Sequence, residues 1–265
     1  MSKRGFVSKY GPWAVVTGAS DGIGHAFAEQ LAERGLSVVL VARRAERLAE
    51  LGGAIRARHG GEVRVVAADL STAEGLEAVE RATAGLDVGL LVASAGYGTS
   101  GSLLDADLKQ ERNMLDVNCY AVLDECVHFG KLLAGRGRGG MILLASLVGW
   151  QGVPRTAHYA ATKAYVQSLA EALRIELKPK GVDVLSCAPG PVRSGFAARA
   201  DMVMGAAVTP DVVAREALNS LGRKGTVVPG GLSKLLTYAL TPLPRFLRSL
   251  ILAQVMGEMT KHQGA

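Results

Sequence analysis

The sequence of 265 residues contains few cysteines, few aromatic residues and no long apolar run. Its three cysteines, Cys119, Cys126 and Cys187, show neither CxxC spacing nor a histidine at ligand spacing, which argues against a disulfide framework and a zinc site. No run of roughly eighteen apolar residues is present, which argues against a membrane span. The basic start leads into glycines and not into a cleavable apolar segment. We therefore expect a cytoplasmic protein that binds no metal ion.

The excess of positive charge is small and dispersed. The chain has 30 Lys and Arg against 24 Asp and Glu, a net charge of +6, while aromatic residues make up only 5%. No recognition module for nucleic acid accompanies the basic residues, so we expect no nucleic acid partner. Weak attraction for an anionic small molecule is a better use of this charge. With 49% hydrophobic residues, the chain suits a single domain, residues 1–265.

Short β-branched runs alternate with amphipathic helical stretches along the chain. The expected strands are 13–16, 36–42, 63–67, 89–93, 140–145, 182–187 and 226–228. This alternation predicts an α/β fold, a Rossmann-type doubly wound parallel sheet with helices on both faces. Ligands of such sheets lie beyond the carboxyl ends of the strands, so the residues that follow each strand are candidates for a site.

Three glycines follow the first strand, in the stretch WAVVTGASDGIGHAFAEQLAERG. Gly18, Gly22 and Gly24 lie between an apolar run and a helical pattern. The missing Cβ atoms let backbone N–H groups approach a bulky anion, and the helix that follows directs its positive end to the same place. The pattern predicts a diphosphate site. The alternative is a tight turn without a ligand.

The second strand ends at two arginines. An acidic residue about twenty positions after the glycines would bind the ribose hydroxyls of NAD, whereas arginine accommodates a 2′-phosphate. Arg43 holds this position, and Arg44 follows it. Because guanidinium groups form paired bonds to phosphate, we expect NADP (NADPH) to be favoured over NAD. The alternative is that both arginines only solvate the start of a helix.

A tyrosine and a lysine lie four residues apart in HYAATKAY. On a helix, Tyr159 and Lys163 share one face, where the ammonium is expected to lower the pKa of the phenol from about 10. Such a pair also arises by chance, but two further residues, Ser146 and Asn118, support its significance. Ser146 ends the fifth strand, and Asn118 lies in the helix before that strand.

These motifs, in this order, resemble the short-chain dehydrogenase/reductase family. The match runs from about Gly11 to Ser194 and includes the TGxxxGxG turn and the segment PGPVRS. Within the family, YGPWAVVTGASDGIG and YAATKAYVQSLAEALRIEL are most similar to the branch with 3-ketoacyl and 17β-hydroxysteroid reductases. The resemblance implies a seven-stranded sheet of order 3-2-1-4-5-6-7 and hydride transfer between NAD(P) and a carbonyl or alcohol. It also implies a homodimer or homotetramer joined through helices.

The resemblance assigns roles to individual residues. Ser146 and Tyr159 would hydrogen-bond the substrate oxygen, with Tyr159 as general acid and base. Lys163 would bind the nicotinamide ribose and keep the phenol acidic, and Asn118 would hold a water that resupplies the proton. The expected cofactor-binding residues are Gly18, Ser20, Asp21, Gly22, Ile23, Gly24, Arg43, Arg44, Asp69, Leu70, Ala95, Gly96, Tyr159, Lys163, Pro189, Gly190, Val192 and Ser194.

Two positions depart from the family's pattern. Its Asn-Asn-Ala-Gly segment is Ala93-Ser94-Ala95-Gly96 here, which removes an amide that braces the central strands, and Ser94 replaces only part of its bonding. Its Pro-Gly-x-x-x-Thr segment ends at Ser194. This serine keeps a hydroxyl for the nicotinamide carboxamide or the diphosphate.

The residues 195–210 are the expected substrate loop. Phe196, Met202, Val203 and Met204 are expected to form an apolar pocket wall of adaptable shape. Long-chain acyl, steroid-like and small aromatic ketones, with the corresponding aldehydes or alcohols, are all open as substrates. The alternative function is a non-catalytic NADP-binding sensor or interaction protein, which would need the glycines but not the four catalytic residues.

The last feature is a C-terminal helical extension, residues 232–259. Leu247, Leu250, Ile251 and Val255 are expected to share one helix face. Packing over the substrate pocket or against a sister subunit is the first interpretation of this face. Contact with a membrane surface is the alternative.

Overall fold

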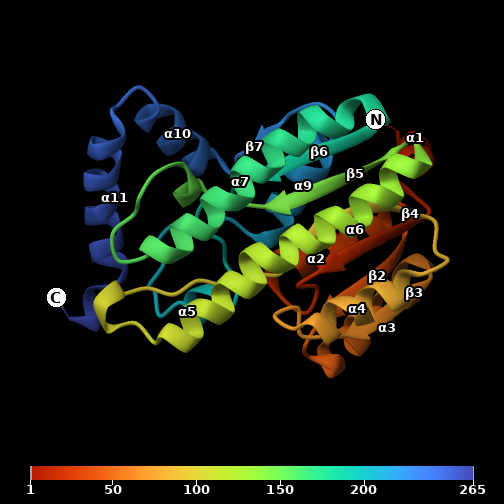
Figure 1. Ribbon diagram of the computed structural model, residues 1–265, viewed down its shortest axis with the longest axis horizontal. Coiled ribbons are helices and arrows are strands. Elements are labelled where there is room, and N and C mark those ends of the chain that lie inside the picture. The colour runs from red at the N-terminus through yellow and green to blue at the C-terminus, as the bar shows by residue number, and fades with distance from the viewer. Residues whose placement is uncertain (1, 265) are drawn as a thin grey trace.

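The computed structural model describes residues 2–264, and its strands form one parallel sheet of seven in the order β3-β2-β1-β4-β5-β6-β7 (Figure 1). The strands are β1 (Trp13–Thr17), β2 (Ser37–Ala42), β3 (Val63–Ala67), β4 (Val88–Ala93), β5 (Gly139–Leu144), β6 (Val182–Cys187) and β7 (Thr226–Val227). The predicted fold class and strand order are confirmed.

Helices cover both faces of the sheet. They are α1 (Lys3–Tyr10), α2 (Gly22–Glu33), α3 (Ala45–His59), α4 (Ala73–Thr83), α5 (Leu108–Leu115), α6 (Ala121–Arg136), α7 (Ala157–Leu177), α8 (Phe196–Arg199), α9 (Pro210–Ser220), α10 (Gly231–Leu240) and α11 (Arg245–Met259). One core cluster joins α2, α3 and α9 to the sheet, and a second joins α4, α6 and α7 to its other face. Figure 1 shows α6 and α7 crossing the face turned toward the viewer.

The central strands are long apolar runs because helices bury them on both sides. Every residue of β4, β5 and β6 is buried. The edge strand β3 alternates less regularly and exposes part of its length. Runs of this kind are typical of parallel sheets, whose two faces are both excluded from water. The carboxyl ends of the strands therefore meet at one rigid edge, where the candidate site lies.

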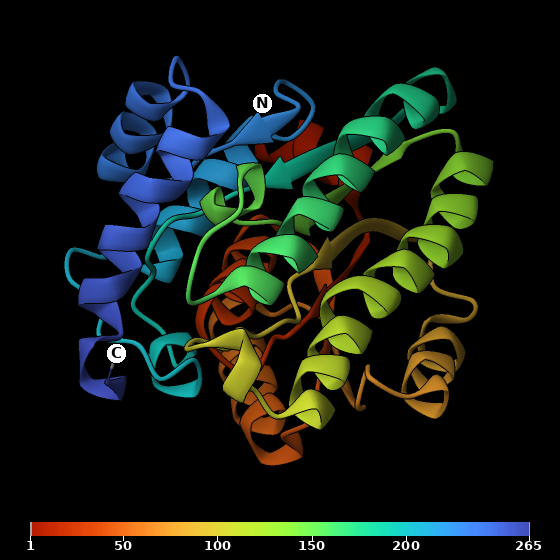
Figure 2. The same ribbon diagram turned by 60° about the vertical axis from the view of Figure 1, so that its left-hand side comes forward.

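The C-terminal helices α10 and α11 stand apart from the two helical layers. Figure 1 shows them in blue at one end of the molecule, and Figure 2 shows the C-terminus on the same side as the segment around α8. Main-chain and side-chain bonds fix this arrangement: the Val203 amide donates to the Met259 carbonyl at 2.9 Å, and Gln263 Nε2 donates to Ser100 Oγ at 2.7 Å. Across residues 2–264, no helix has the length and apolar character needed to cross a membrane.

Candidate active site

The glycine turn between β1 and α2 has the shape that a diphosphate requires. Gly18 adopts φ +69°, and a Cβ placed on it would lie 2.9 Å from the backbone of Ala95. Asp21 caps the first turn of α2 by accepting a hydrogen bond from the Gly22 amide at 2.7 Å. The turn thus brings backbone close to the sheet edge at the positive end of a helix, which fits a nucleotide diphosphate.

The two arginines after β2 are half exposed, and each contacts a residue that lines the cavity. Arg44 donates to Ser20 Oγ at 3.0 Å and lies 3.8 Å from the Asp21 carboxylate. Arg43 Nη1 lies 3.9 Å from Asp69 Oδ2. Although Arg44 precedes α3, it makes no side-chain cap of that helix. These contacts favour a role at the cofactor end, and the choice between a phosphate site and a solvated helix start stays a prediction.

The residues after β3 and β4 complete the same end of the site. Asp69 Oδ1 accepts hydrogen bonds from the Ser71 amide at 3.0 Å and its hydroxyl at 2.8 Å. Burial raises the pKa of Asp69, but the Ser71 bonds and the Arg43 charge outweigh it and leave the pKa below its ordinary value. The carboxylate is therefore ionised at neutral pH, and its second oxygen lies 3.9 Å from Arg43 Nη1.

Ser94 connects β4 to β1 in place of the missing amide. Its hydroxyl donates to the Thr17 carbonyl, and its amide donates to Thr17 Oγ1 at 3.2 Å. The Ala95 amide reaches the same hydroxyl at 3.3 Å. The brace between the central strands is thus present, built from two hydroxyls and backbone.

Three of the proposed catalytic side chains come from the segment after β5 and from α7. Lys163 is buried, and its Nζ donates to the Leu144 carbonyl at 2.7 Å and lies 5.9 Å from the centre of the Tyr159 ring. Phe196 packs on the other side, with its ring centroid 5.3 Å from that of Tyr159. Ser146 is buried and begins the short helical turn before α7. The strand end and one helix face therefore hold these groups together.

The pKa expected of the phenol differs from the one found. Burial raises the pKa of Tyr159 to about 12, while hydrogen bonding by Ser146 lowers it. Burial also lowers the pKa of Lys163 to about 8. The expectation that the ammonium makes this phenol more acidic than usual is wrong for this structure, because desolvation outweighs a lysine whose charge is directed to the Leu144 carbonyl.

Asn118 has a different set of partners from the one expected. It lies in a π-helical turn, Asp116–Tyr120, and is fully buried. Its amide donates to the Tyr97 carbonyl at 2.8 Å and to Thr162 Oγ1 at 3.0 Å, so both N–H groups are used. The side chain fixes the β4 loop to α7 and does not line the cavity. Its water-holding role stays a prediction.

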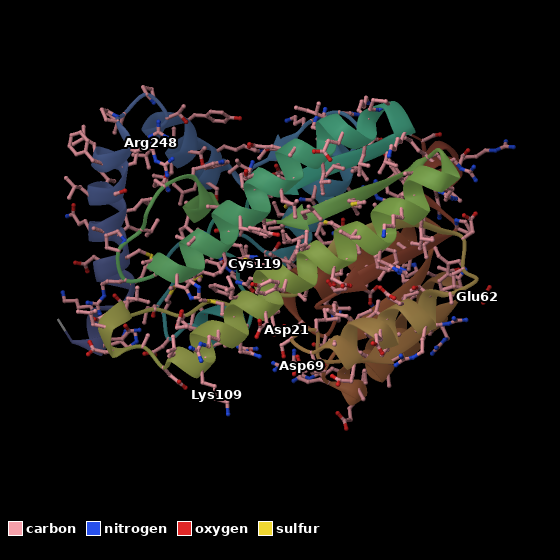
Figure 3. All side chains as sticks on the ribbon, viewed as in Figure 1. Asp21, Glu62, Asp69, Lys109, Cys119 and Arg248 are labelled. Atoms are coloured by element: carbon pink, nitrogen blue, oxygen red, sulfur yellow. The ribbon has the colours of Figure 1, made fainter. Side chains whose placement is uncertain are left out.

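One cavity of about 1020 Å³ is lined by nearly all the predicted site residues. Every expected cofactor-binding residue lines it, together with Ser146, Tyr159 and Lys163; Asn118 does not. Figure 3 shows Asp21 and Asp69 close together and Arg248 far from them, near the turn between α10 and α11. The cavity therefore has a polar end at the glycine turn and a second end under the C-terminal helices. Within residues 2–264, no cluster of His, Cys, Asp and Glu is placed to hold a metal ion.

The second end is apolar and is built from the substrate loop and the C-terminal extension. Phe196, Met202 and Met204 line it, as expected, but Val203 does not: its side chain is exposed, because its amide is drawn to the Met259 carbonyl. A small apolar core joins this loop to α11. The expected pocket wall is thus formed by three of the four residues.

The predicted face of α11 is only partly right. Ile251 and Val255 line the cavity, but Leu250 points outward and is 63% exposed. The buried contacts of the helix come from Leu252 and Met256, which the predicted face omitted. Apolar residues lie around most of this helix, so their spacing alone does not select one face.

Two further residues at or near the site were not predicted from the sequence. Arg199 stacks on Tyr97, with its guanidinium carbon 3.8 Å from the ring centre. Glu125 of α6 is buried and its Oε1 has no hydrogen-bond partner among residues 2–264. Burial raises the pKa of this carboxyl to about 8, which the Thr17 hydroxyl partly offsets. No local pattern marks either residue, because both act on segments far away in the sequence.

A sequence model of the short chain dehydrogenase family matches residues 12–202. The chain therefore belongs to this family of oxidoreductases, which act on CH–OH and C=O groups. It is 34% identical to a 7beta-hydroxysteroid dehydrogenase of Collinsella aerofaciens over 239 residues, 85% of this chain and 89% of that protein. It is 38% identical to a very-long-chain 3-oxoacyl-CoA reductase of Podospora anserina over 181 residues, 66% of this chain and 53% of that protein.

Solved structures give the same picture. A structure of a 7beta-hydroxysteroid dehydrogenase matches with a TM-score of 0.86 and 30% identity, over 93% of this chain and 98% of that chain. A short-chain dehydrogenase from Sphingobium yanoikuyae in complex with NADPH matches with a TM-score of 0.79 and 28% identity, over 90% and 95%. The predicted likeness to steroid and ketoacyl reductases is confirmed.

Proposed function

We propose that this protein is an NADP(H)-dependent reductase or dehydrogenase of bulky apolar ketones and alcohols, with Tyr159 as general acid and base. One observation carries the proposal: Tyr159 lies where a glycine turn flanked by arginines and an apolar pocket open into the same cavity. A binding protein without catalysis would have no need of an apolar chamber beside the nicotinamide end.

The preference for NADP rests on the arginines. Arg44 contacts Ser20 and Asp21 of the glycine turn, Arg43 lies near Asp69, and both guanidinium groups are half exposed, so they could bind the 2′-phosphate that NADP carries and NAD lacks. The NADPH complex of the Sphingobium yanoikuyae protein supports this choice. The glycine cradle, Asp69 and the small residues Ala95 and Gly96 would hold the rest of the cofactor.

Each side chain near Tyr159 has a step to perform. Bound NADPH would supply the hydride for the carbonyl carbon. Ser146 donates a hydrogen bond to the carbonyl oxygen and stabilises the charge that develops there. The Tyr159 phenol, neutral because burial keeps its pKa high, then gives its proton to that oxygen. Lys163, held by the Leu144 carbonyl, would hydrogen-bond the nicotinamide ribose and would lie beside the phenolate that results.

The shape of the pocket supports a large, rigid or long-chain substrate. Its walls are Met202, Met204, Leu252, Met256 and their apolar neighbours, and it extends from Ser146 to the C-terminal helices. A steroid-like ketone is our first choice, since the matched hydroxysteroid dehydrogenase is similar over 85% of the chain. A long-chain 3-oxoacyl group is the second.

Assembly and location belong to the same proposal. Tyr120, Leu123 and Val127 form an exposed apolar stripe with Tyr165 of α7, and we propose that it joins two copies in a homodimer. A cytoplasmic location is supported by three buried cysteines that are free thiols. Exposed side chains on the outside of α10 and α11 keep membrane contact as the alternative for that surface.

Turnover with a substrate panel tests the function. The purified protein is mixed with NADPH or NADH and with steroid ketones, 3-oxoacyl thioesters and small aromatic ketones, and cofactor oxidation is followed by absorbance. We expect oxidation of NADPH with a bulky apolar ketone. Tight NADPH binding without turnover on any member of the panel would favour the sensor interpretation instead.

A further inference from the structure

Three guanidinium groups meet at the polar end of the cavity, but only two carboxylates accompany them. Arg43 lies near Asp69 and Arg44 lies near Asp21, so each has one acidic neighbour. The third group belongs to Arg199, which lines the same cavity. Its pKa lies below its ordinary value, because burial and the charge of Arg43 outweigh the opposite effects of Tyr97 and Asp69. Among residues 2–264, Arg199 forms no ion pair of its own and shares Asp69 with Arg43, so this end of the cavity carries an excess of one positive charge.

Arg199 reaches this place from the substrate loop, not from the dinucleotide-binding turn. The loop crosses directly over that turn: a Cβ on Gly22 would lie 2.9 Å from the Cβ of Ser194, and one on Gly195 would lie 2.5 Å from the Asp21 carboxylate. The short helix α8 then carries Arg199 to the ring of Tyr97, at 3.8 Å. The same loop thus covers the diphosphate turn and places a cation beside it.

Both partners of this stack are fixed. Tyr97 is buried, and its hydroxyl donates to the Gln110 carbonyl at 2.9 Å. Beyond Arg199, the Ala200 carbonyl accepts from Ser100 Oγ at 2.6 Å, and the Asp201 carbonyl accepts from Gln263 Nε2 at 2.6 Å. The loop is therefore tied down on its far side, while the guanidinium on its near side faces the cavity.

We propose that Arg199 is a third arginine of the cofactor site, which binds a phosphate of the dinucleotide and thereby holds the substrate loop over it. The proposal rests on the NADP(H) function above and adds a residue that the glycine turn and the β2 arginines do not include. A cofactor with several phosphate charges supplies the anion that this end of the cavity lacks. Because Arg199 shares a short loop with Phe196 and Met202, cofactor binding then shapes the substrate pocket.

Binding measurements on a matched pair of variants test this. NADPH and NADH are titrated by calorimetry into the wild type, Arg199→Ala, Arg199→Lys and Arg193→Ala. Arg193 is an exposed residue of the same segment that does not line the cavity, so its removal subtracts one positive charge without touching the site. We expect Arg199→Ala to bind NADPH about tenfold or more weakly, Arg199→Lys to recover part of the loss, and Arg193→Ala to bind as the wild type does.

The two cofactors identify the phosphate. A loss for NADPH alone assigns Arg199 to the 2′-phosphate, and an equal loss for both cofactors assigns it to the diphosphate. Equal affinities in Arg199→Ala and Arg193→Ala overturn the inference but leave the proposed function intact. A wild type that binds neither cofactor overturns both.

Hydrogen exchange separates phosphate binding from simple packing of the loop. In the wild type, NADPH is expected to slow exchange of the amides in residues 195–204. In Arg199→Ala, this protection should be reduced at saturating NADPH while the melting temperature without cofactor is unchanged. Full protection in the variant would show that the Arg199–Tyr97 stack only packs the loop and would overturn the proposal.

Discussion

The two ends of the cavity are built in opposite ways. The cofactor end is made of strand termini, a glycine turn and charged residues that follow β1, β2 and β3 within a few positions. The substrate end is made of a loop and two helices that follow β6 and β7, with methionine and leucine side chains that meet across long sequence distances. The sheet positions the first end rigidly, whereas the second depends on how the C-terminal extension packs.

This difference distinguishes the cofactor site, which members of the family have in common, from the substrate site, which differs between members. Hydride transfer needs the dinucleotide at one fixed place, and parallel strand ends provide it. The substrate end has only to enclose an apolar body, and flexible methionines such as Met202 and Met256 adapt to many shapes. Substitutions should therefore divide into those that act on the cofactor and those that act on the substrate, with Tyr159 between them.

The largest effect is expected at the boundary between the two ends. Tyr159→Phe keeps the ring against Phe196 but removes the proton, so turnover should fall about 100-fold or more while NADPH affinity stays close to that of the wild type. Steady-state kinetics and calorimetric titration measure the two quantities. If the variant keeps a tenth of the wild-type kcat, the assigned role of Tyr159 is wrong.

A smaller effect, confined to the cofactor end, is expected for Arg43→Ala. Only NADPH loses a charge-assisted contact, so its Kd should rise about tenfold while that of NADH changes little. Arg47→Ala, an exposed residue of α3 outside the cavity, is the control. Equal weakening of both cofactors, or a wild type that prefers NADH, would remove the argument for a phosphate clamp.

At the substrate end, Met256→Ala should act on KM. The side chain is buried in the cluster that walls the pocket, so its loss is expected to raise KM for a bulky ketone about fivefold with kcat nearly unchanged. Phe246→Ala removes an apolar side chain from the outer surface of the same helix and should change neither constant. A fall in NADPH affinity in Met256→Ala would contradict the separation of the two ends.

The last effect concerns stability beneath the cofactor end. Burial raises the pKa of Glu125 to about 8 from an ordinary value near 4.5, so between these pH values the folded protein holds a proton that the unfolded chain has released. The contribution of this carboxyl to the free energy of unfolding is therefore largest below pH 4.5 and falls as the pH rises toward 8. Glu125→Gln should raise the free energy of unfolding by about 4 kcal/mol at pH 8 and by about 1 kcal/mol or less at pH 5.

Urea unfolding at the two pH values measures this difference. Glu176→Gln, on the exposed surface of α7, is the control and should show no dependence of this kind. An equal gain for Glu125→Gln at both pH values would mean that the carboxyl is not neutral in the folded protein.

The cofactor end of the cavity could be predicted from the sequence more fully than the substrate end. The alternation of strands and helices predicted the parallel sheet, because burial on both faces leaves apolar runs that are visible without a structure, while the family resemblance supplied the strand order. The glycine turn and Arg43 were also visible, since a left-handed glycine and a strand end impose local requirements. Ser94 was expected to replace only part of an amide's bonding, and the structure shows how it does so, through Thr17.

The sequence by itself determined the strands and their parallel arrangement, the class of cofactor turn and the Tyr159–Lys163 pair, because periodicity, glycine conformation and helical spacing act over a few residues. The tertiary structure alone decided that burial leaves Tyr159 a weaker acid, that Leu252 and Met256 are the buried residues of α11, and that Arg199 stacks on Tyr97. Those outcomes depend on desolvation and on contacts between distant segments. Neither can be predicted from the spacing of residues along the chain.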